Sequence, residues 1–316
     1  MPPPSVFWTE AVREQFALAR AELNMSEAID VPLLHGDRNP HMYCIVDYCG
    51  VLLVYARVWK SGNNQICSRM IVTNGLPFPT RWCAQHPCFF FSFVREPLSH
   101  FISGYSEVQW RLREPPLDAT ATPPAQFIRR VLAGGMRCHE CAHTLPLVSL
   151  LARPADAPLD FVGRLDSLPA DWDERLRARV LELRPEHGAC AAGAPPDESL
   201  SVPAGGTRAT FPWGESNSTH PGSDALSGFA PREAMEALLL RSADRSHLRA
   251  MCRVLLPDYA CFGYPLPAEC AEGSGLDRVV KRMRPYCGEL LDMRPGALTP
   301  FLPRTASSST SARTPR

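Results

Sequence analysis

The chain lacks a net charge and a long hydrophobic run, and both absences narrow its possible roles. Its 33 basic residues balance its 33 acidic residues, so no overall field draws it to nucleic acid or to an anionic membrane. Its longest apolar runs, around Val51 and Phe89, fall far short of the ~20 residues that a membrane-spanning helix needs. We therefore expect no nucleic-acid partner, and contact with a membrane only through an anchor that this chain does not contain.

A secretory signal is also missing from the start of the chain. Met1-Pro-Pro-Pro-Ser5 has neither the basic residues nor the apolar core of a signal peptide. The 316 residues suffice for one sizeable α/β core or for two small domains. Composition divides them into an N-terminal helix and loop (1–40), a main domain (41–294) and a disordered tail (295–316). A Gly-, Ala-, Pro- and Ser-rich loop insertion is expected at 185–228.

Cysteine, in contrast, is abundant. Twelve cysteines, an even number, favour an oxidising compartment in which some of them form disulfides. The alternative is a set of buried free thiols, because cysteine is among the most buried residue types. Asn24-Met-Ser26 and Asn217-Ser-Thr219 are glycosylation sequons, which matter only in the secretory pathway.

The first motif that carries chemistry is a strand followed by a loop that can bind an anion. The apolar run from Val51 to Val58 predicts a buried strand, and the helix after the loop is predicted to open at Gln65. Loop amides at a helix N-terminus, with a lysine beside them, form a cradle for a phosphate-like group. The candidate ligands are Lys60, Ser61, Gly62, Asn63 and Asn64.

A second motif of the same kind follows thirty-five residues later. Phe89–Val94 predicts a strand that ends on Arg95, and Pro97 suits the first turn of a helix. Ser103 lies on that helix, on the face nearest the arginine. A guanidinium with a hydroxyl is a good receptor for a terminal phosphate.

The order of these two motifs resembles the Golgi carbohydrate sulfotransferases, which use 3′-phosphoadenosine 5′-phosphosulfate (PAPS). In that family the lysine loop holds the 5′-phosphosulfate, while an arginine and a serine eight residues apart hold the 3′-phosphate. Arg95 and Ser103 have that separation. Phe161–Trp172, Asn217–His220 and Asp258–Tyr264 also resemble the family. Its lysine loop usually carries Ser or Thr where this chain has two asparagines, which indicates a divergent member.

The resemblance implies a PAPS-binding strand–loop–helix (P-loop-like) sulfotransferase fold. Strands that alternate with helices independently predict an α/β protein with a mostly parallel central sheet and helices on both faces. Ligands of such sheets lie at the carboxyl ends of the strands, where Lys60 and Arg95 are expected. The resemblance also implies a location in the Golgi lumen, provided that an anchor or signal is missing from this chain.

The implied reaction moves a sulfuryl group from PAPS to a hydroxyl of a carbohydrate or similar acceptor, without a metal. Lys60 is the expected stabiliser of charge on the leaving oxygen. The family has a histidine-containing segment after the arginine block, and here His143 is the first candidate for the general base. His139 and Glu140 come next. Arg164 and Asp166 are expected to order the acceptor side, or to form an ordinary ion pair.

Three alternatives remain open at the sequence level. Cys138 and Cys141, with His139 and His143, have the residue types of a zinc site that Cys83 and Cys88 would complete. An ATP-dependent kinase is disfavoured because Lys60 precedes Gly62, whereas a Walker loop places the lysine after its glycines. The third alternative is a member of the same fold that binds a nucleotide or glycan but catalyses no reaction.

Overall fold

A computed structural model describes the chain in the ranges 4–25, 43–48, 51–58, 60–67, 70–73, 87–111, 123–133, 143–151, 158–183, 207–208, 231–272 and 275–291, and at residues 83, 293 and 297. Most of the predicted insertion at 185–228 and nearly all of the predicted tail at 295–316 lie outside these ranges. So do Asn217, Cys138, His139, Glu140 and Cys141, whose predictions are not addressed by the structure.

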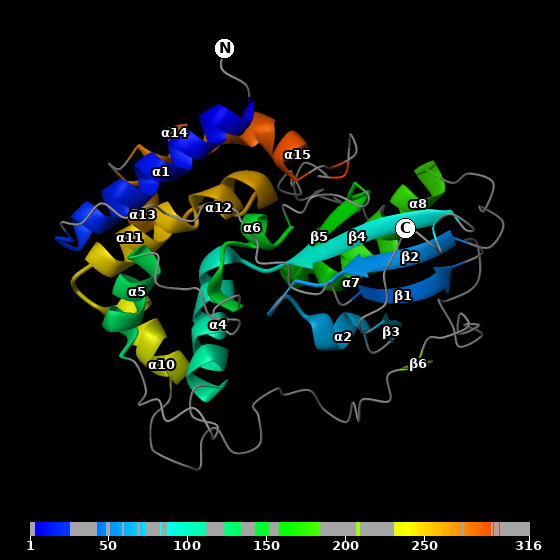
Figure 1. Cartoon of the computed structure of the whole chain (residues 1–316), viewed down its shortest axis with the longest axis horizontal. Coiled ribbons are helices and arrows are strands. Elements are labelled where there is room, and N and C mark those ends of the chain that lie inside the picture. Colours follow the sequence, from blue (N-terminus) through cyan, green and yellow to red (C-terminus); the bar gives the residue numbers. More distant parts are fainter. Residues whose placement is uncertain are drawn as a thin grey trace, which may run out of the picture.

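The described elements are a mixture of strands and helices as far as β6, and from residue 231 onward they are helical (Figure 1). The strands are β1 (Tyr43–Tyr48), β2 (Val51–Ala56), β3 (Ile71–Thr73), β4 (Cys88–Val94), β5 (Phe161–Arg164) and β6 (Thr207–Arg208). The helices up to residue 183 are α1 (Pro4–Glu22), α2 (Asn63–Cys67), α4 (Pro97–Arg111), α5 (Pro124–Leu132), α6 (Leu147–Leu151), α7 (Leu168–Ala170) and α8 (Arg177–Leu183). Those that follow are α10 (Pro231–Glu236), α11 (Ser246–Val254), α12 (Leu256–Phe262), α13 (Ala268–Ala271), α14 (Leu276–Met283) and α15 (Cys287–Leu290).

The strands form one mixed sheet in the order β5-β4-β2-β1-β3-β6. The neighbours β2, β4 and β5 are parallel, whereas β1 pairs antiparallel with both β2 and β3, and β3 pairs antiparallel with β6. The α/β class is confirmed, but the expected mostly parallel sheet is wrong. Only two residues, 49 and 50, separate β1 from β2, and a parallel crossover needs a dozen or more.

Helices cover both faces of this sheet, as predicted. Alternate residues of β4 point to opposite faces: Phe89, Phe91 and Phe93 belong to one buried cluster, and Phe90 and Val94 to the other. The phenylalanine cluster packs against α2, α8 and the helical turn before α8, where the Trp172 ring stacks on Phe93 at a centroid distance of 6.0 Å. The other face is covered by the larger set of helices on the left of Figure 1.

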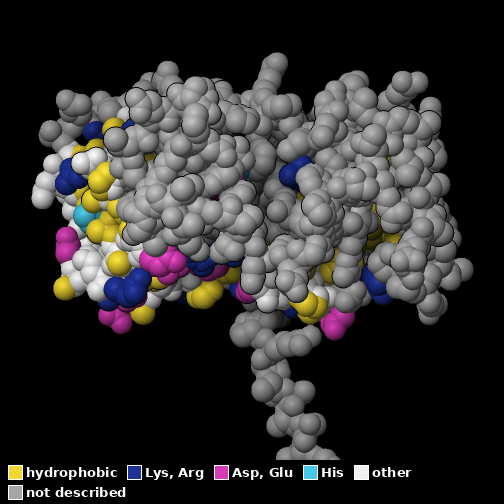
Figure 2. Space-filling view, turned by 90° about the horizontal axis from the view of Figure 1, so that it is seen from below, with side chains coloured by type: hydrophobic (Ala, Val, Ile, Leu, Met, Phe, Trp, Pro, Cys, Tyr) yellow, Lys and Arg dark blue, Asp and Glu magenta, His cyan; other side chains and the backbone are white. Residues whose placement is uncertain are grey.

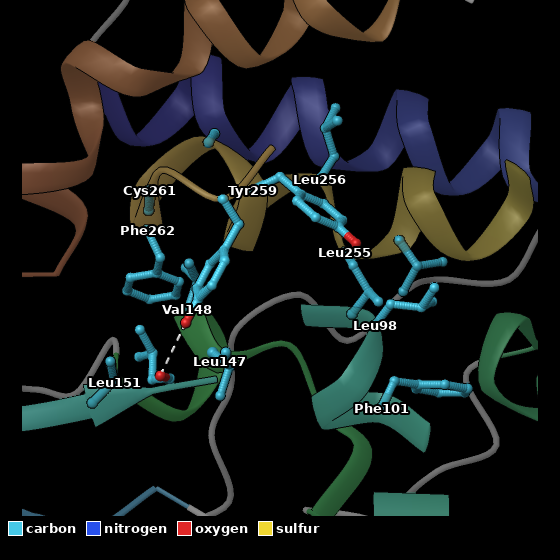
Figure 3. Packing of buried hydrophobic residues seen from close by; sticks show 14 of the residues in the cluster. Leu98, Phe101, Leu147, Val148, Leu151, Leu255, Leu256, Tyr259, Cys261 and Phe262 are labelled. Atoms are coloured by element: carbon cyan, nitrogen blue, oxygen red, sulfur yellow. Dashed lines mark hydrogen bonds between the residues drawn. The ribbon is translucent and has the colours of Figure 1, made fainter. Parts of the chain in front are cut away.

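Helix α4 is the element that joins the sheet to this helical half. Its apolar face places Leu98 and Phe101 in a cluster with residues of α6 and α12, such as Val148 and Tyr259 (Figure 3). Its first turn is capped by Glu96, whose carboxylate accepts hydrogen bonds from the backbone N–H groups of Leu98 (3.1 Å) and Ser99 (2.6 Å). The cap and the core contacts fix the start of α4 beside the end of β4.

Among the described residues, four disulfides join eight cysteines: Cys44–Cys67, Cys83–Cys88, Cys252–Cys270 and Cys261–Cys287. The expectation of disulfides is therefore confirmed, and they indicate an oxidising environment such as the secretory pathway or the cell exterior. The first of them ties α2 to strand β1. The helix that follows the lysine loop is thus covalently held against the sheet.

Candidate functional site

The two predicted anion loops lie at one edge of the sheet. Strands β2 and β4 run parallel and adjacent, with Leu52 opposite Cys88 and Tyr55 opposite Phe91. Their carboxyl ends therefore lie side by side, and the loop after β2 and the loop after β4 leave the sheet together. Strand β5 is the parallel neighbour on the other side of β4, so its last residue, Arg164, lies at this edge as well.

The lysine loop has an unusual backbone. Lys60 is in the left-handed region (φ 60°), which costs a non-glycine residue roughly 1–2 kcal/mol, and Gly62 is also left-handed (φ 74°). A Cβ on Gly62 would lie 2.5 Å from Leu165 Cδ1, so glycine lets this loop approach the segment after β5. Helix α2 begins at Asn63, two residues before the predicted start.

Polar contacts brace this loop from the strand below it. The hydroxyl of Tyr55 donates a hydrogen bond to Asn63 Oδ1 (2.9 Å), and the buried Asn63 side chain is thereby turned toward the strand. The Ser61 side chain is fully buried, and its Oγ has no hydrogen-bond partner among the described residues. Asn64 is the second residue of α2, and its side chain lies outside the described part of the structure.

Arg95 and Ser103 meet as predicted. Arg95 Nη1 donates to Ser103 Oγ at 3.2 Å, and it also lies 3.5 Å from the carbonyl oxygen of Lys60. The second contact links the two loops directly, because the guanidinium after β4 reaches the backbone of the loop after β2. The predicted receptor for a terminal phosphate is therefore adjacent to the predicted lysine cradle.

Positive charge is concentrated at this point. Burial lowers the pKa of Arg95, and the nearby guanidinium of Arg232 on α10 lowers it further. The neighbouring Glu96 carboxylate raises the pKa of Arg95, and Arg232 pairs with Glu236 at 2.9 Å, so carboxylates offset part of this positive charge. A bound anion would offset the repulsion that remains between the two guanidinium groups. On the face in Figure 2, the described acidic and basic side chains are intermingled.

A carboxylate from α4 contacts the candidate catalytic lysine. Lys60 Nζ lies 2.6 Å from Glu107 Oε2, and the Glu107 side chain is only 5% exposed. The sequence argument missed Glu107. Its signal was present, since Ser99, Ser103 and Glu107 recur every four residues and so share one face of α4.

A second signal that we missed is the scarcity of lysine. The chain has 33 lysine and arginine residues, and only Lys60 and Lys281 are lysines. An ammonium group is a compact point charge with three rotatable donors, whereas a guanidinium is a planar fork. Position 60 is therefore one of only two places in this arginine-rich chain that carry the compact cation.

The candidate base, His143, lies beside α4. The backbone carbonyl of His143 lies against Gly104, and a Cβ on that glycine would collide with it. Gly104 directly follows Ser103, so the histidine segment approaches the helix at the level of this candidate phosphate ligand. The His143 side chain is 5% exposed. The structure thus brings the histidine segment to the same helix as Ser103 and Glu107.

Asp258 anchors the helix that follows this histidine. Its fully buried carboxylate accepts hydrogen bonds from the backbone N–H groups of Leu147 and Val148, each at 2.8 Å, at the start of α6. Burial raises the pKa of Asp258, the two hydrogen bonds oppose this rise, and the charge of Glu96 adds to it; the net result is a pKa of about 7. The position of the His143 segment therefore depends on helix α12.

Arg164 and Asp166 form an ion pair at the sheet edge, with Arg164 Nη2 2.5 Å from Asp166 Oδ2. Tyr264 joins them: its hydroxyl lies 3.0 Å from Asp166 Oδ1 and 3.2 Å from the Val94 carbonyl oxygen, either of which can accept its one hydrogen. Its ring lies under the Arg164 guanidinium. Tyr264 thereby links the end of β4 to the segment after β5.

The zinc alternative loses one of its two cysteine pairs. Cys83 and Cys88 are bonded to each other, and disulfide sulfurs are not the thiolate ligands that zinc requires. The other pair, Cys138 and Cys141, lies outside the described ranges.

Comparisons with known proteins add no relative to this picture. No protein-family model, no curated protein and no solved structure matches the chain. Within the part of the chain that the structure describes, none of the helices has the length and apolar character needed to cross a membrane. Fold and site alone thus define an α/β protein with a cationic pair of loops at the edge of its parallel strands.

Proposed function

We propose that the chain is a PAPS-dependent sulfotransferase that modifies a hydroxyl of a carbohydrate or similar acceptor. The observation that carries the proposal is the contact between the two loops. Arg95 touches both Ser103 and the backbone of Lys60, so a single ligand with negative groups at two ends can engage both. PAPS and its product, adenosine 3′,5′-bisphosphate, have that charge distribution.

The residues present fit such a donor. Arg95 and Ser103 would hold the 3′-phosphate, with Arg232 nearby as a further cation. Lys60, the backbone of Gly62 and the buried Ser61 hydroxyl, which lacks a partner among the described residues, would hold the 5′-phosphosulfate. Asn63 supports the loop through Tyr55, and Asn64 contributes its backbone amide.

In this reaction the acceptor oxygen forms a bond to sulfur while the bond from sulfur to the bridging oxygen breaks. The acceptor proton passes to a base, and the negative charge left on the bridging oxygen stays with the 5′-phosphate of the product. Lys60 neutralises that charge, which grows as the transfer proceeds, so its interaction is stronger in the transition state than in the ground state. Arg95 and Ser103 orient the nucleotide.

His143 is our proposed base because its segment lies against α4 next to Ser103. A neutral imidazole accepts a proton near pH 7. The four disulfides agree with a lumenal enzyme, and we propose the Golgi lumen as its location.

Calorimetry with adenosine 3′,5′-bisphosphate and with adenosine 5′-monophosphate tests the binding half of the proposal. The wild type should bind the bisphosphate more tightly, and Arg95→Ala should lose about ten- to hundredfold in affinity for the bisphosphate only, as expected for one charge-assisted contact. Arg249→Ala is the matched control, because Arg249 pairs with Glu22 between helices that carry no candidate ligand. Equal loss for both nucleotides would refute the role of Arg95, and tighter binding of ATP would favour the kinase alternative.

A further inference from the structure

Glu107 poses a physical problem for an anion-binding site. Its carboxylate is almost fully buried and lies 2.6 Å from the Lys60 ammonium, where its negative charge opposes any phosphate or sulfate that binds there. A buried carboxylate is costly even before a ligand arrives. Its presence beside the lysine therefore needs a compensating role.

We propose that Glu107 is a positioning residue that holds the Lys60 side chain ready for transfer and, through its charge, weakens the binding of the nucleotide. This inference rests on the proposed function. An ammonium has three N–H donors, so Glu107 can hold one of them while the others remain for the ligand. A lysine that is already immobilised loses less freedom when the donor binds and is in place when charge develops on the bridging oxygen.

The backbone supports the same role. Lys60 adopts a left-handed conformation that a residue with a side chain rarely takes, and two contacts hold it there. Arg95 reaches its carbonyl oxygen from the loop after β4, and Glu107 holds its ammonium from α4. Strain at a site persists when the surroundings over-determine the residue, as these contacts do here.

Helix α4 consequently sets the distance between the two ends of the ligand. Ser103 and Glu107 are one helical turn apart, so the residue that binds the 3′-phosphate and the residue that holds Lys60 belong to one rigid element. A helix does not stretch, and the separation between the two anion subsites is thereby fixed. This arrangement favours a ligand whose two charged groups are a set distance apart.

Two substitutions of Glu107 separate the effect of its negative charge from the effect of its side-chain length. In Glu107→Gln the amide oxygen still accepts a hydrogen bond, but the opposing charge is gone. Affinity for adenosine 3′,5′-bisphosphate should rise about three- to tenfold, the effect expected for one like charge a few ångströms away in a partly solvated site. Turnover should fall by about tenfold or more, because Lys60 is held less firmly. Glu107→Asp keeps the charge and shortens the reach, so turnover should fall without a gain in affinity.

Amine labelling reports whether the Lys60 ammonium is held by Glu107, and the measurement needs no nucleotide. The chain has two lysines, and Lys281 is exposed on α14. Both are acetylated with a limiting amount of acetic anhydride, and mass spectrometry measures the labelling of Lys60, with Lys281 as the internal reference. The ratio of Lys60 to Lys281 labelling should rise severalfold in Glu107→Gln. Glu22→Gln removes an equal charge from an ion pair between α1 and α11 and should leave both labelling and affinity unchanged.

The outcomes distinguish the two proposals. Unchanged Lys60 labelling in Glu107→Gln would overturn the positioning role, whatever the nucleotide result. Weaker binding of the bisphosphate by Glu107→Gln, at an unchanged melting temperature, would overturn the opposing-charge role. Absence of bisphosphate binding by the wild type would instead refute the proposed function, while the labelling result would still report on Glu107.

Discussion

The stability of the protein should fall as pH rises through the range in which Asp258 ionises. Asp258 is fully buried, and its pKa is raised from 3.8 to about 7. Between these values the folded chain retains a proton that the unfolded chain has released. The free energy of unfolding therefore decreases with rising pH, by on the order of 4 kcal/mol from below pH 4 to above pH 7 from this one group. This stability is fully present below pH 4 and is lost as pH passes 7.

Asp258→Asn isolates the contribution, because an amide does not titrate. One of the two backbone N–H groups at the start of α6 loses its acceptor in the variant, a constant cost of about 1–3 kcal/mol. Urea unfolding of the oxidised protein at several pH values between 4 and 8 gives both free energies. The advantage of wild type over variant should be largest near pH 4 and shrink toward pH 8. A constant advantage would mean that the two hydrogen bonds offset the cost of burying the charge, and an advantage that grows with pH would mean that they outweigh it.

Two further variants test how the histidine segment is held and what it does. His143→Ala should lower turnover by ~100–10,000-fold, the usual value of general-base help. Its affinity for adenosine 3′,5′-bisphosphate and its melting temperature should not change. A joint fall in turnover and melting temperature would instead assign His143 a structural role. Gly104→Ala should destabilise the protein by roughly 1–3 kcal/mol, because its Cβ collides with the His143 carbonyl. Gly288→Ala is the matched helical control: its Cβ would meet nothing within 4 Å, so thermal unfolding should show no loss of stability.

The local elements followed from the sequence because their patterns are short-range. The apolar run at Val51 and the phenylalanine run at Phe89 became the buried strands β2 and β4, and Pro97 opens α4 as predicted. The proximity of Lys60 and Arg95 also followed, because both come after parallel strands and such strands end at one edge.

The remaining features depend on contacts between distant residues. The antiparallel half of the sheet was missed because the hairpin between β1 and β2 turns in two residues that were not recognised as a turn. Glu107 and Lys60 are 47 residues apart in the sequence. The periodicity of α4 shows that Glu107 lies on the same helix face as Ser103, but it does not show which residue packs against that face. The dependence of the His143 segment on Asp258 spans more than 100 residues, and a single aspartate before Tyr259 gives no local sign of it.

The central claim is that Lys60 drives sulfuryl transfer at the junction of the two loops. Transfer of radiolabelled sulfate from PAPS to a panel of glycans, lipids and small alcohols, by wild type and by Lys60→Ala, tests it most directly. The account predicts transfer to at least one hydroxyl acceptor by the wild type, and a loss of about 100–1,000-fold in the variant with its fold intact by circular dichroism. A variant that transfers sulfate within about threefold of the wild type, or a wild type that binds the bisphosphate yet labels no acceptor, would contradict it.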